Sequence, residues 1–186
     1  MQNYSFINEP KKFTVTNDSV TITTEPKTDY FNKTHYNFEV TNGPAYVTTA
    51  TKNFTYTVRA QFKYQAQYDQ AQIFMFIDEN NWVKAGLEGS IDFKQIGAVV
   101  TQSGYSDWSS FDFDPKCEQV ILRLHRKGDD FKIEFKTDNM DWTQLRIFHM
   151  TNVQETVKIG VMACSPSQSS FDAKFDQFKL EELLWK

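Results

Sequence analysis

The chain has 186 residues, a mass of 21.8 kDa and a formal net charge of −4, from 20 Lys and Arg against 24 Asp and Glu. This length predicts one domain spanning residues 1–186. A balanced charge provides no broad basic surface, so neither nucleic acid nor an anionic membrane is expected as a partner. The longest apolar run is Ile73 to Ile77, far short of a membrane span, and a polar segment follows Met1. A cytoplasmic location is therefore predicted.

Two cysteines, Cys117 and Cys164, stand 47 residues apart, and neither belongs to a Cys-x-x-Cys pair. A domain of this size does not need a disulfide for stability, and the predicted compartment is reducing. Two free thiols are expected, with no zinc or redox motif.

Alternation with period two dominates the chain and predicts β-strands throughout. The first two β-branched runs, 14–16 and 20–24, are separated by the turn sequence Asn17-Asp18-Ser19. Further strands are predicted, in chain order, at 36–48, 54–64, 71–77, 82–88, 96–102, 119–126, 130–137, 143–149, 157–164 and 171–180. About a dozen short strands at this spacing predict an all-β fold, a two-sheet antiparallel jelly-roll sandwich. Residues 181–185 could form a helical turn or an apolar tail.

The predicted strand 82–88 has an unusual outer face. Alternation points Val83, Ala85 and Leu87 toward the core. The opposite face then carries Trp82, Lys84, Gly86 and Glu88. An aromatic surface, a donor, an acceptor and space for close approach are what a ligand-binding strand would present, although a solvated face with a Trp at one end is equally compatible with the pattern.

Lys84 and Glu88 are four residues apart, which is roughly 13 Å along a strand, so they cannot pair directly. Each must pair with another strand or remain free for a ligand, and Arg123 is a plausible partner for Glu88. His125, on the same outward face as Arg123, is expected to be a surface residue.

Several ordered sequence blocks carry a family resemblance. They are Asn81-Trp82-Val83-Lys84-Ala85-Gly86-Leu87-Glu88, Val99-Val100-Thr101, Tyr105-Ser106-Asp107-Trp108-Ser109, Leu122-Arg123-Leu124, Lys127-Gly128-Asp129 and Val161-Met162-Ala163-Cys164-Ser165-Pro166, with Phe131, Trp142 and Arg146 between them. Together they resemble the uncharacterised concanavalin A-like domain family related to the regulation-of-enolase protein, which is similar to the domain appended to some β-xylosidases. The resemblance covers about residues 30–180.

The resemblance implies a lectin/glucanase sandwich whose curved front sheet forms a groove, with a flatter sheet behind it. Carried over as ligand-binding residues are Trp82, Lys84, Glu88, Ser106, Asp107, Trp108 and Arg123. Trp108 could equally be a rim aromatic that seals the core. Fold alone does not assign an activity.

Catalysis is less favoured than binding. A glycosidase needs two carboxyl groups that face one space, and the alternating acidic pattern of glucanases is missing. Asp112 and Asp114 share a face but run into Pro115, so a solvated loop is the better interpretation. Glu88 with Asp107 or Glu134 remains a possible pair across strands. His35, His125 and His149 show no metal-ligand spacing, so no metal or other cofactor is expected. If the protein is an enzyme at all, it would be a glycoside hydrolase.

The predicted function is non-catalytic binding of a carbohydrate or similar small polar ligand in the groove of the concave sheet. Aromatic faces would cover the apolar side of a sugar ring, while Lys84, Glu88 and Arg123 would orient its hydroxyl groups. The alternative is a regulatory or scaffold protein that acts on a protein partner through the tail Leu183-Leu184-Trp185 or an outward aromatic patch.

Overall fold

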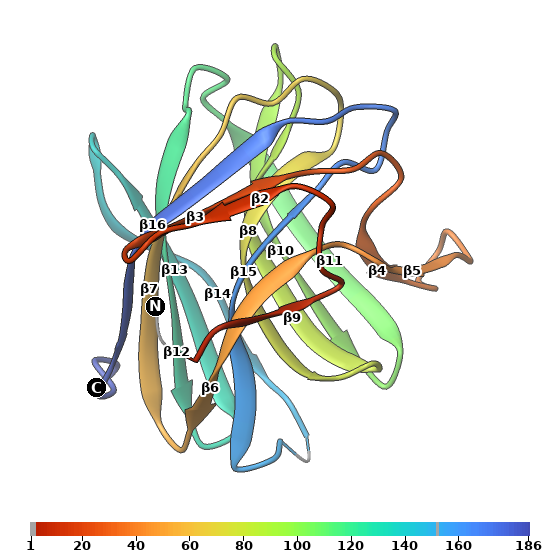
Figure 1. The fold of residues 1–186 in the computed structure, drawn as a ribbon. Helices are drawn as coiled ribbons and strands as arrows, with labels where there is room; N and C mark the ends of the chain where they lie inside the picture. The colour runs from red at the N-terminus through yellow and green to blue at the C-terminus, as the bar shows by residue number, and fades with distance from the viewer. Residues whose placement is uncertain (1–2, 152) are drawn as a thin grey trace.

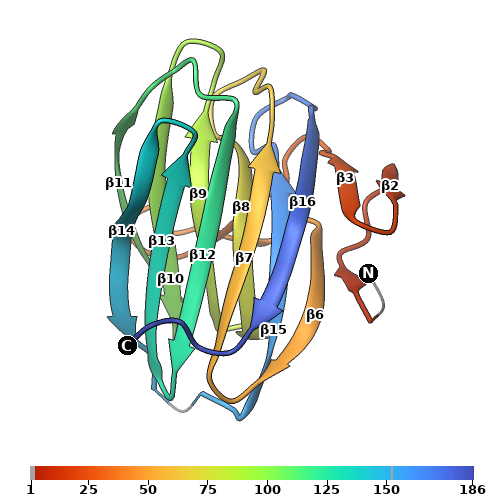
Figure 2. The ribbon, with the colours of Figure 1, turned by 90° about the vertical axis from the view of Figure 1, so that its left-hand side faces the viewer.

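The computed structural model describes residues 3–151 and 153–186, which form two seven-stranded antiparallel sheets stacked face to face (Figures 1 and 2). The front sheet contains, in spatial order, β1 (Ser5–Ile7), β6 (Ala45–Thr51), β15 (Thr156–Cys164), β8 (Asp69–Asp78), β9 (Asn81–Gly89), β10 (Lys94–Gln102) and β11 (Tyr105–Phe113). The back sheet contains β14 (Met140–His149), β13 (Asp130–Thr137), β12 (Gln119–Lys127), β7 (Phe54–Gln61), β16 (Asp172–Glu181), β3 (Ser19–Thr23) and β2 (Phe13–Val15). The predicted antiparallel two-sheet sandwich is confirmed.

The main hydrophobic core lies between the two sheets. Val83, Ala85 and Leu87 of β9 are buried in it, opposite residues of the back sheet such as Leu122 and Ile133. Because neighbouring side chains on a strand point to opposite faces, this arrangement places Lys84 and Glu88 on the outer face of the front sheet. The face assignment made from alternation is therefore confirmed for these strands.

A short hairpin covers part of that outer face. It consists of β4 (Tyr30–Asn32), β5 (Glu39–Thr41) and the loop between them, and it projects to the right of the sandwich in Figure 1. Beneath it lies a second, smaller core, in which Tyr30 and Phe31 pack against Phe74, Trp82 and residues of β6, β10 and β15. This hairpin replaces the first part of the strand predicted at 36–48, which is broken at Asn42-Gly43-Pro44.

The structure adds one strand and decides one alternative that the sequence left open. Residues 105–113 form the edge strand β11, which the alternation pattern did not reveal because most of its side chains are exposed and polar. The residues after β16 form no helical turn. The last five, 182–186, cross the outer face of the back sheet, and we call them the C-terminal strap (Figure 2).

Candidate functional site

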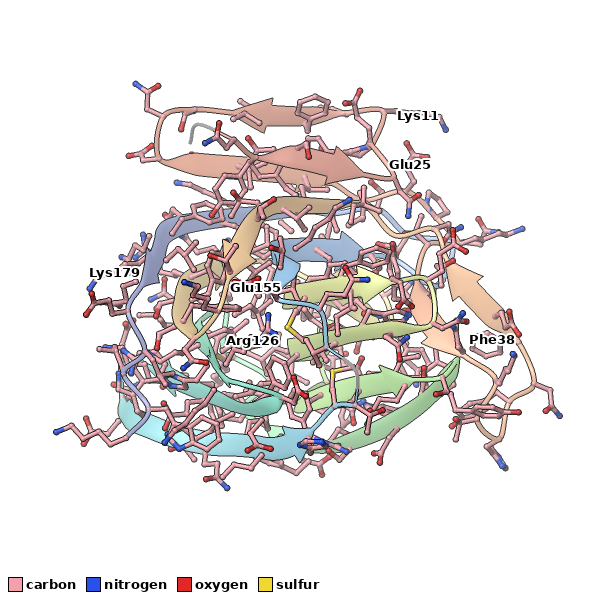
Figure 3. The ribbon with its side chains drawn as sticks, turned by 90° about the horizontal axis from the view of Figure 1, so that it is seen from below. Lys11, Glu25, Phe38, Arg126, Glu155 and Lys179 are labelled. Carbon is pink, nitrogen blue, oxygen red and sulfur yellow. The ribbon has the colours of Figure 1, made fainter. Side chains whose placement is uncertain are left out.

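A pocket of about 190 Å³ opens on the outer face of the front sheet, beside the hairpin. Its aromatic residues come from the hairpin, from the segment before β8 and from β11: Phe31, Tyr36, Phe38, Tyr68 and Trp108. Its polar residues, which we call the polar cluster, are Asp29, Gln70, Lys84 and Glu88. Figure 3 shows Phe38 on the hairpin side of the sandwich, with Lys179 of the back sheet on the opposite side.

The pairing of three strands brings the polar cluster together. Gln70 of β8 and Gln95 of β10 are the register partners of Glu88, so the three side chains form one row across the sheet. Between Lys84 and Glu88, Gly86 adds no side chain; a Cβ there would lie 2.9 Å from the carbonyl oxygen of Ala71. Its φ of +152° also favours glycine. The site therefore needs glycine at this position for both space and backbone geometry.

Lys84 is almost fully buried and is held by two oxygen acceptors. Its ammonium group lies 2.8 Å from Asp29 Oδ1 and donates to Gln70 Oε1 at 2.7 Å. Burying a charge is costly unless it is paired and hydrogen-bonded. Asp29, which precedes β4, therefore holds the start of the hairpin close to the sheet and also forms one side of the pocket.

Glu88 is the second carboxylate of the polar cluster and is 6% exposed. Its Oε1 accepts a short hydrogen bond from Gln95 Nε2. Burial raises the pKa of the Glu88 carboxyl above its ordinary value of 4.5, and the positive charge of Lys84 and the Gln95 hydrogen bond offset only part of this increase. A carboxyl with a raised pKa in a pocket is a typical feature of a binding or catalytic site.

Trp82 is a structural residue in this fold. The indole is fully buried in the second core, 5.2 Å from the ring of Tyr30 between ring centroids, and its Nε1 is buried without a hydrogen-bond partner in the described residues. The expectation that Trp82 projects into an open groove is wrong, because the hairpin covers that end of β9.

Ser106 and Asp107 serve the scaffold around the site. The hydroxyl of Ser106 accepts the backbone N–H of Asn32 at 2.9 Å and lies 2.8 Å from the hydroxyl of Thr101, so it fixes the hairpin to β10 and β11. Asp107 faces the other way and pairs with Arg146 of β14 at 2.8 Å. Of the block 105–109, only Trp108 lines the pocket.

Arg123 does not join the site. It belongs to β12 in the back sheet, on its outer face, where its guanidinium lies 3.7 Å from the ring centroid of Trp142. The predicted pairing of Arg123 with Glu88 is wrong, since the whole sandwich separates them. Glu134 also lies on that outer face, 3.9 Å from Arg123, so neither Glu134 nor Asp107 is placed to share a space with Glu88.

The prediction thus placed three of its seven residues in the pocket: Lys84, Glu88 and Trp108. It missed Asp29, Gln70 and the hairpin aromatics. A signal existed for Gln70, because Gln70 and Gln72 alternate with apolar residues at the start of β8. No local sequence pattern indicates Asp29 as a site residue, because its partner Lys84 is 55 residues away in the sequence.

The chain matches the family described as "Protein of unknown function (DUF1349)" over residues 6–183. It belongs to the DUF1349 family. Among its relatives, Regulation of enolase protein 1 of Saccharomyces cerevisiae is 30% identical over 182 residues, covering 98% of this chain and 91% of the relative. The family assignment expected from the sequence blocks is confirmed.

Solved structures place this DUF1349 chain among concanavalin A-like sandwiches. A Saccharomyces cerevisiae protein described as functionally unknown superposes with a TM-score of 0.91 at 29% identity, over 98% of this chain and 97% of that one. The carbohydrate binding module CBM66 from Bacillus subtilis superposes at 0.60, with 15% identity and 98% and 97% coverage. The GH43 protein BlXynB from Bacillus licheniformis gives 0.77 at 15% identity, over 96% of this chain and 36% of that protein. At 15% identity, these last two likenesses establish the fold only.

Two further features concern the described residues of this DUF1349 member. No group of three or more His, Cys, Asp and Glu residues among them is arranged to hold a metal ion. Within the same residues, no helix is long and apolar enough to cross a membrane.

Proposed function

We propose that this chain binds a carbohydrate or a similar small polar ligand in the pocket between the front sheet and the hairpin, without converting it. The observation that carries the proposal is the combination of a buried polar cluster with five aromatic side chains around one opening. Aromatic faces pack against the C–H faces of a sugar ring, and a few precisely held polar groups select its orientation.

The size of the pocket indicates what would fit. Pockets for drug-sized ligands usually measure roughly 300–1,000 Å³, so 190 Å³ suits one sugar ring or the end of a longer glycan. One structural neighbour is described as a carbohydrate binding module, and others belong to GH43 glycoside hydrolases. These neighbours make a carbohydrate a reasonable first ligand class, and the pocket residues supply the chemical argument.

Trp108 offers a direct test, because it is 37% exposed and lines the pocket. We would titrate the protein with D-xylose, D-glucose, D-galactose and β-1,4-xylobiose, following tryptophan fluorescence and saturation-transfer NMR. Trp108→Ala removes an aromatic face against which a sugar ring would pack, and a loss of about 1.4 kcal/mol weakens binding about tenfold. Trp142→Ala on the back sheet is the matched control and should bind as the wild type does. A folded wild type that binds none of these sugars would contradict the proposal.

A second candidate function is regulation through protein contact, in the manner suggested by the name of the yeast relative. The observation that favours it is a set of exposed aromatics, Tyr36, Tyr105 and Phe111, along the hairpin tip and β11. Exposed aromatic side chains are enriched at protein interfaces. Tyr105→Ser with Phe111→Ser, which leaves the pocket lining unchanged, should then abolish capture of a partner in a pull-down, while Trp185→Ala on the strap should leave it unchanged.

We propose further that residues 1–186 act as one domain and that the protein works in the cytoplasm. Limited proteolysis of the whole chain would test the first statement, since a single domain gives no stable internal fragment. Cell fractionation would test the second.

A further inference from the structure

The polar cluster holds no spare positive charge for an anionic ligand. Lys84 is the only Lys or Arg among the described residues that line the pocket, and its ammonium is already paired with Asp29 at 2.8 Å. Glu88 adds a second carboxyl group to the same pocket. A phosphate or carboxylate entering here would lose its hydration, find no unpaired cation and lie close to two acidic side chains.

Lys84 and Glu88 nevertheless keep hydrogen-bonding capacity. An ammonium group has three N–H donors, and Lys84 spends two of them on Asp29 and Gln70. Glu88 accepts Gln95 through Oε1, so Oε2 remains open among the described residues. A donor and an acceptor are thus both available at the pocket.

These two groups also lie near one another, although their Cα atoms are far apart along β9. The Lys84 ammonium bonds Gln70, and Gln70 is the register partner of Glu88 on the neighbouring strand. The side chain of Lys84 therefore reaches the same row of the sheet as Glu88. This proximity agrees with the effect of the Lys84 charge on the Glu88 carboxyl.

We infer that the pocket takes a neutral sugar ring, two of whose adjacent hydroxyl groups bridge the Lys84 ammonium and the Glu88 carboxyl, and that it rejects phosphorylated sugars and uronic acids. This inference rests on the proposed function. A hydroxyl group is both donor and acceptor, so a neighbouring pair can accept from Lys84 and donate to Glu88 at once. A carboxylate offers acceptors only and would face Glu88 without a proton to share.

The test compares ligands that share the sugar ring and its ring hydroxyl groups and differ in the substituent at C6, which is neutral in one and anionic in the other two. Methyl β-D-glucopyranoside, its uronate and its 6-phosphate would be titrated into wild type, Glu88→Gln and Glu118→Gln, with saturation-transfer NMR as readout and Trp108→Ala to identify pocket binding. Glu118 is an exposed carboxyl outside the pocket and serves as the control. We expect the neutral glycoside to bind the wild type about tenfold more tightly than either anion. Glu88→Gln should weaken binding of the neutral glycoside about tenfold and reduce the ratio of its affinity to that of the uronate. Glu118→Gln should change neither the affinity nor the ratio.

Each other outcome has a separate meaning. If an anionic glycoside binds as well as the neutral one, and Trp108→Ala removes that binding, this inference is overturned and the proposed function survives. Neutral binding that Glu88→Gln leaves intact also overturns the inference alone. If no sugar binds the folded wild type, the proposed function fails and this inference fails with it.

Discussion

The two outer faces of the sandwich are each partly covered by a segment of the chain, and the two coverings differ. On the front sheet, the hairpin buries Trp82 but stops short of Lys84 and Glu88, so a pocket remains beside it. On the back sheet, the C-terminal strap lies over His125, which is 1% exposed although it occupies an outward position. The hairpin leaves Lys84 and Glu88 facing an opening, whereas the C-terminal strap closes over His125.

The hydrogen bonds of the two faces show the same difference. Under the strap, the Leu184 N–H donates a hydrogen bond to Thr55 Oγ1 at 2.8 Å. The same Thr55 oxygen lies 2.8 Å from His125 Nδ1. On the other side of the imidazole ring, His125 Nε2 lies 2.8 Å from Glu134 Oε2. Each polar group in this row of hydrogen bonds therefore has a partner within the protein. In the pocket, Glu88 uses only one of its carboxylate oxygens among the described residues, and Lys84 uses two of its three N–H donors. Unsatisfied polar groups cost stability, and those that face an opening remain available to a ligand.

The largest expected effect belongs to the covering of the front sheet. Trp82→Ala should destabilise the protein by about 3–5 kcal/mol, because it empties the largest site of the second core and leaves Tyr30 without its edge-to-face neighbour. Urea unfolding followed by circular dichroism measures this change.

Trp142→Ala is the control for that measurement. Trp142 is half-buried on the back sheet and contacts Arg123 through its ring, an interaction worth about 0.5–1 kcal/mol. If Trp82→Ala costs no more than this control, the hairpin does not depend on the second core and the contrast between the two coverings is wrong.

The strap should make stability sensitive to pH through His125. Burial lowers the pKa of His125 below its ordinary 6.5, although the hydrogen bond and charge of Glu134 act in the opposite direction; Lys132 and Arg123 reinforce the decrease. Above pH 6.5 both the folded and unfolded chains carry a neutral His125, so it contributes nothing. As the pH falls below 6.5, the unfolded chain takes up a proton that the folded chain resists, and the free energy of unfolding should fall.

Two variants sharpen this prediction. His125→Gln should remove the decrease between pH 6.5 and 5, as measured by urea unfolding at each pH, because the group that titrates is gone. Truncation after Glu181 removes the strap, so His125 becomes hydrated and its pKa should rise toward 6.5 in an NMR titration. A His125 pKa that the truncation leaves unchanged would show that the strap is not what buries it.

The sequence predicts the scaffold of both faces better than their coverings. Alternation alone places Val83 inward and Lys84 outward, because each strand has only two faces to choose between. Whether an outward residue meets solvent depends on segments distant in the chain. Trp82 is buried by Tyr30 and His125 by the strap, and no local pattern in strand 82–88 or 119–126 encodes those contacts. The same limit explains why Arg123 was grouped with Glu88: both are outward, but on different sheets.

The smallest effect on stability is expected inside the pocket, at Glu88. The raised pKa of this carboxyl means that folding disfavours its ionised form. As the pH rises above 4.5, the unfolded chain therefore loses the Glu88 proton before the folded chain does. The free energy of unfolding then falls until the pH has passed the pKa of Glu88 in the folded protein. Glu88→Gln keeps the shape and the contact with Gln95 while removing the charge, and should leave stability at pH 7 equal to or slightly above that of the wild type. His125→Gln and Glu88→Gln should thus remove opposite slopes from the pH profile. A clear loss of stability in Glu88→Gln at pH 7 would mean that Glu88 is needed to hold Lys84 in place, and the pocket face would then be as fully satisfied as the face beneath the strap.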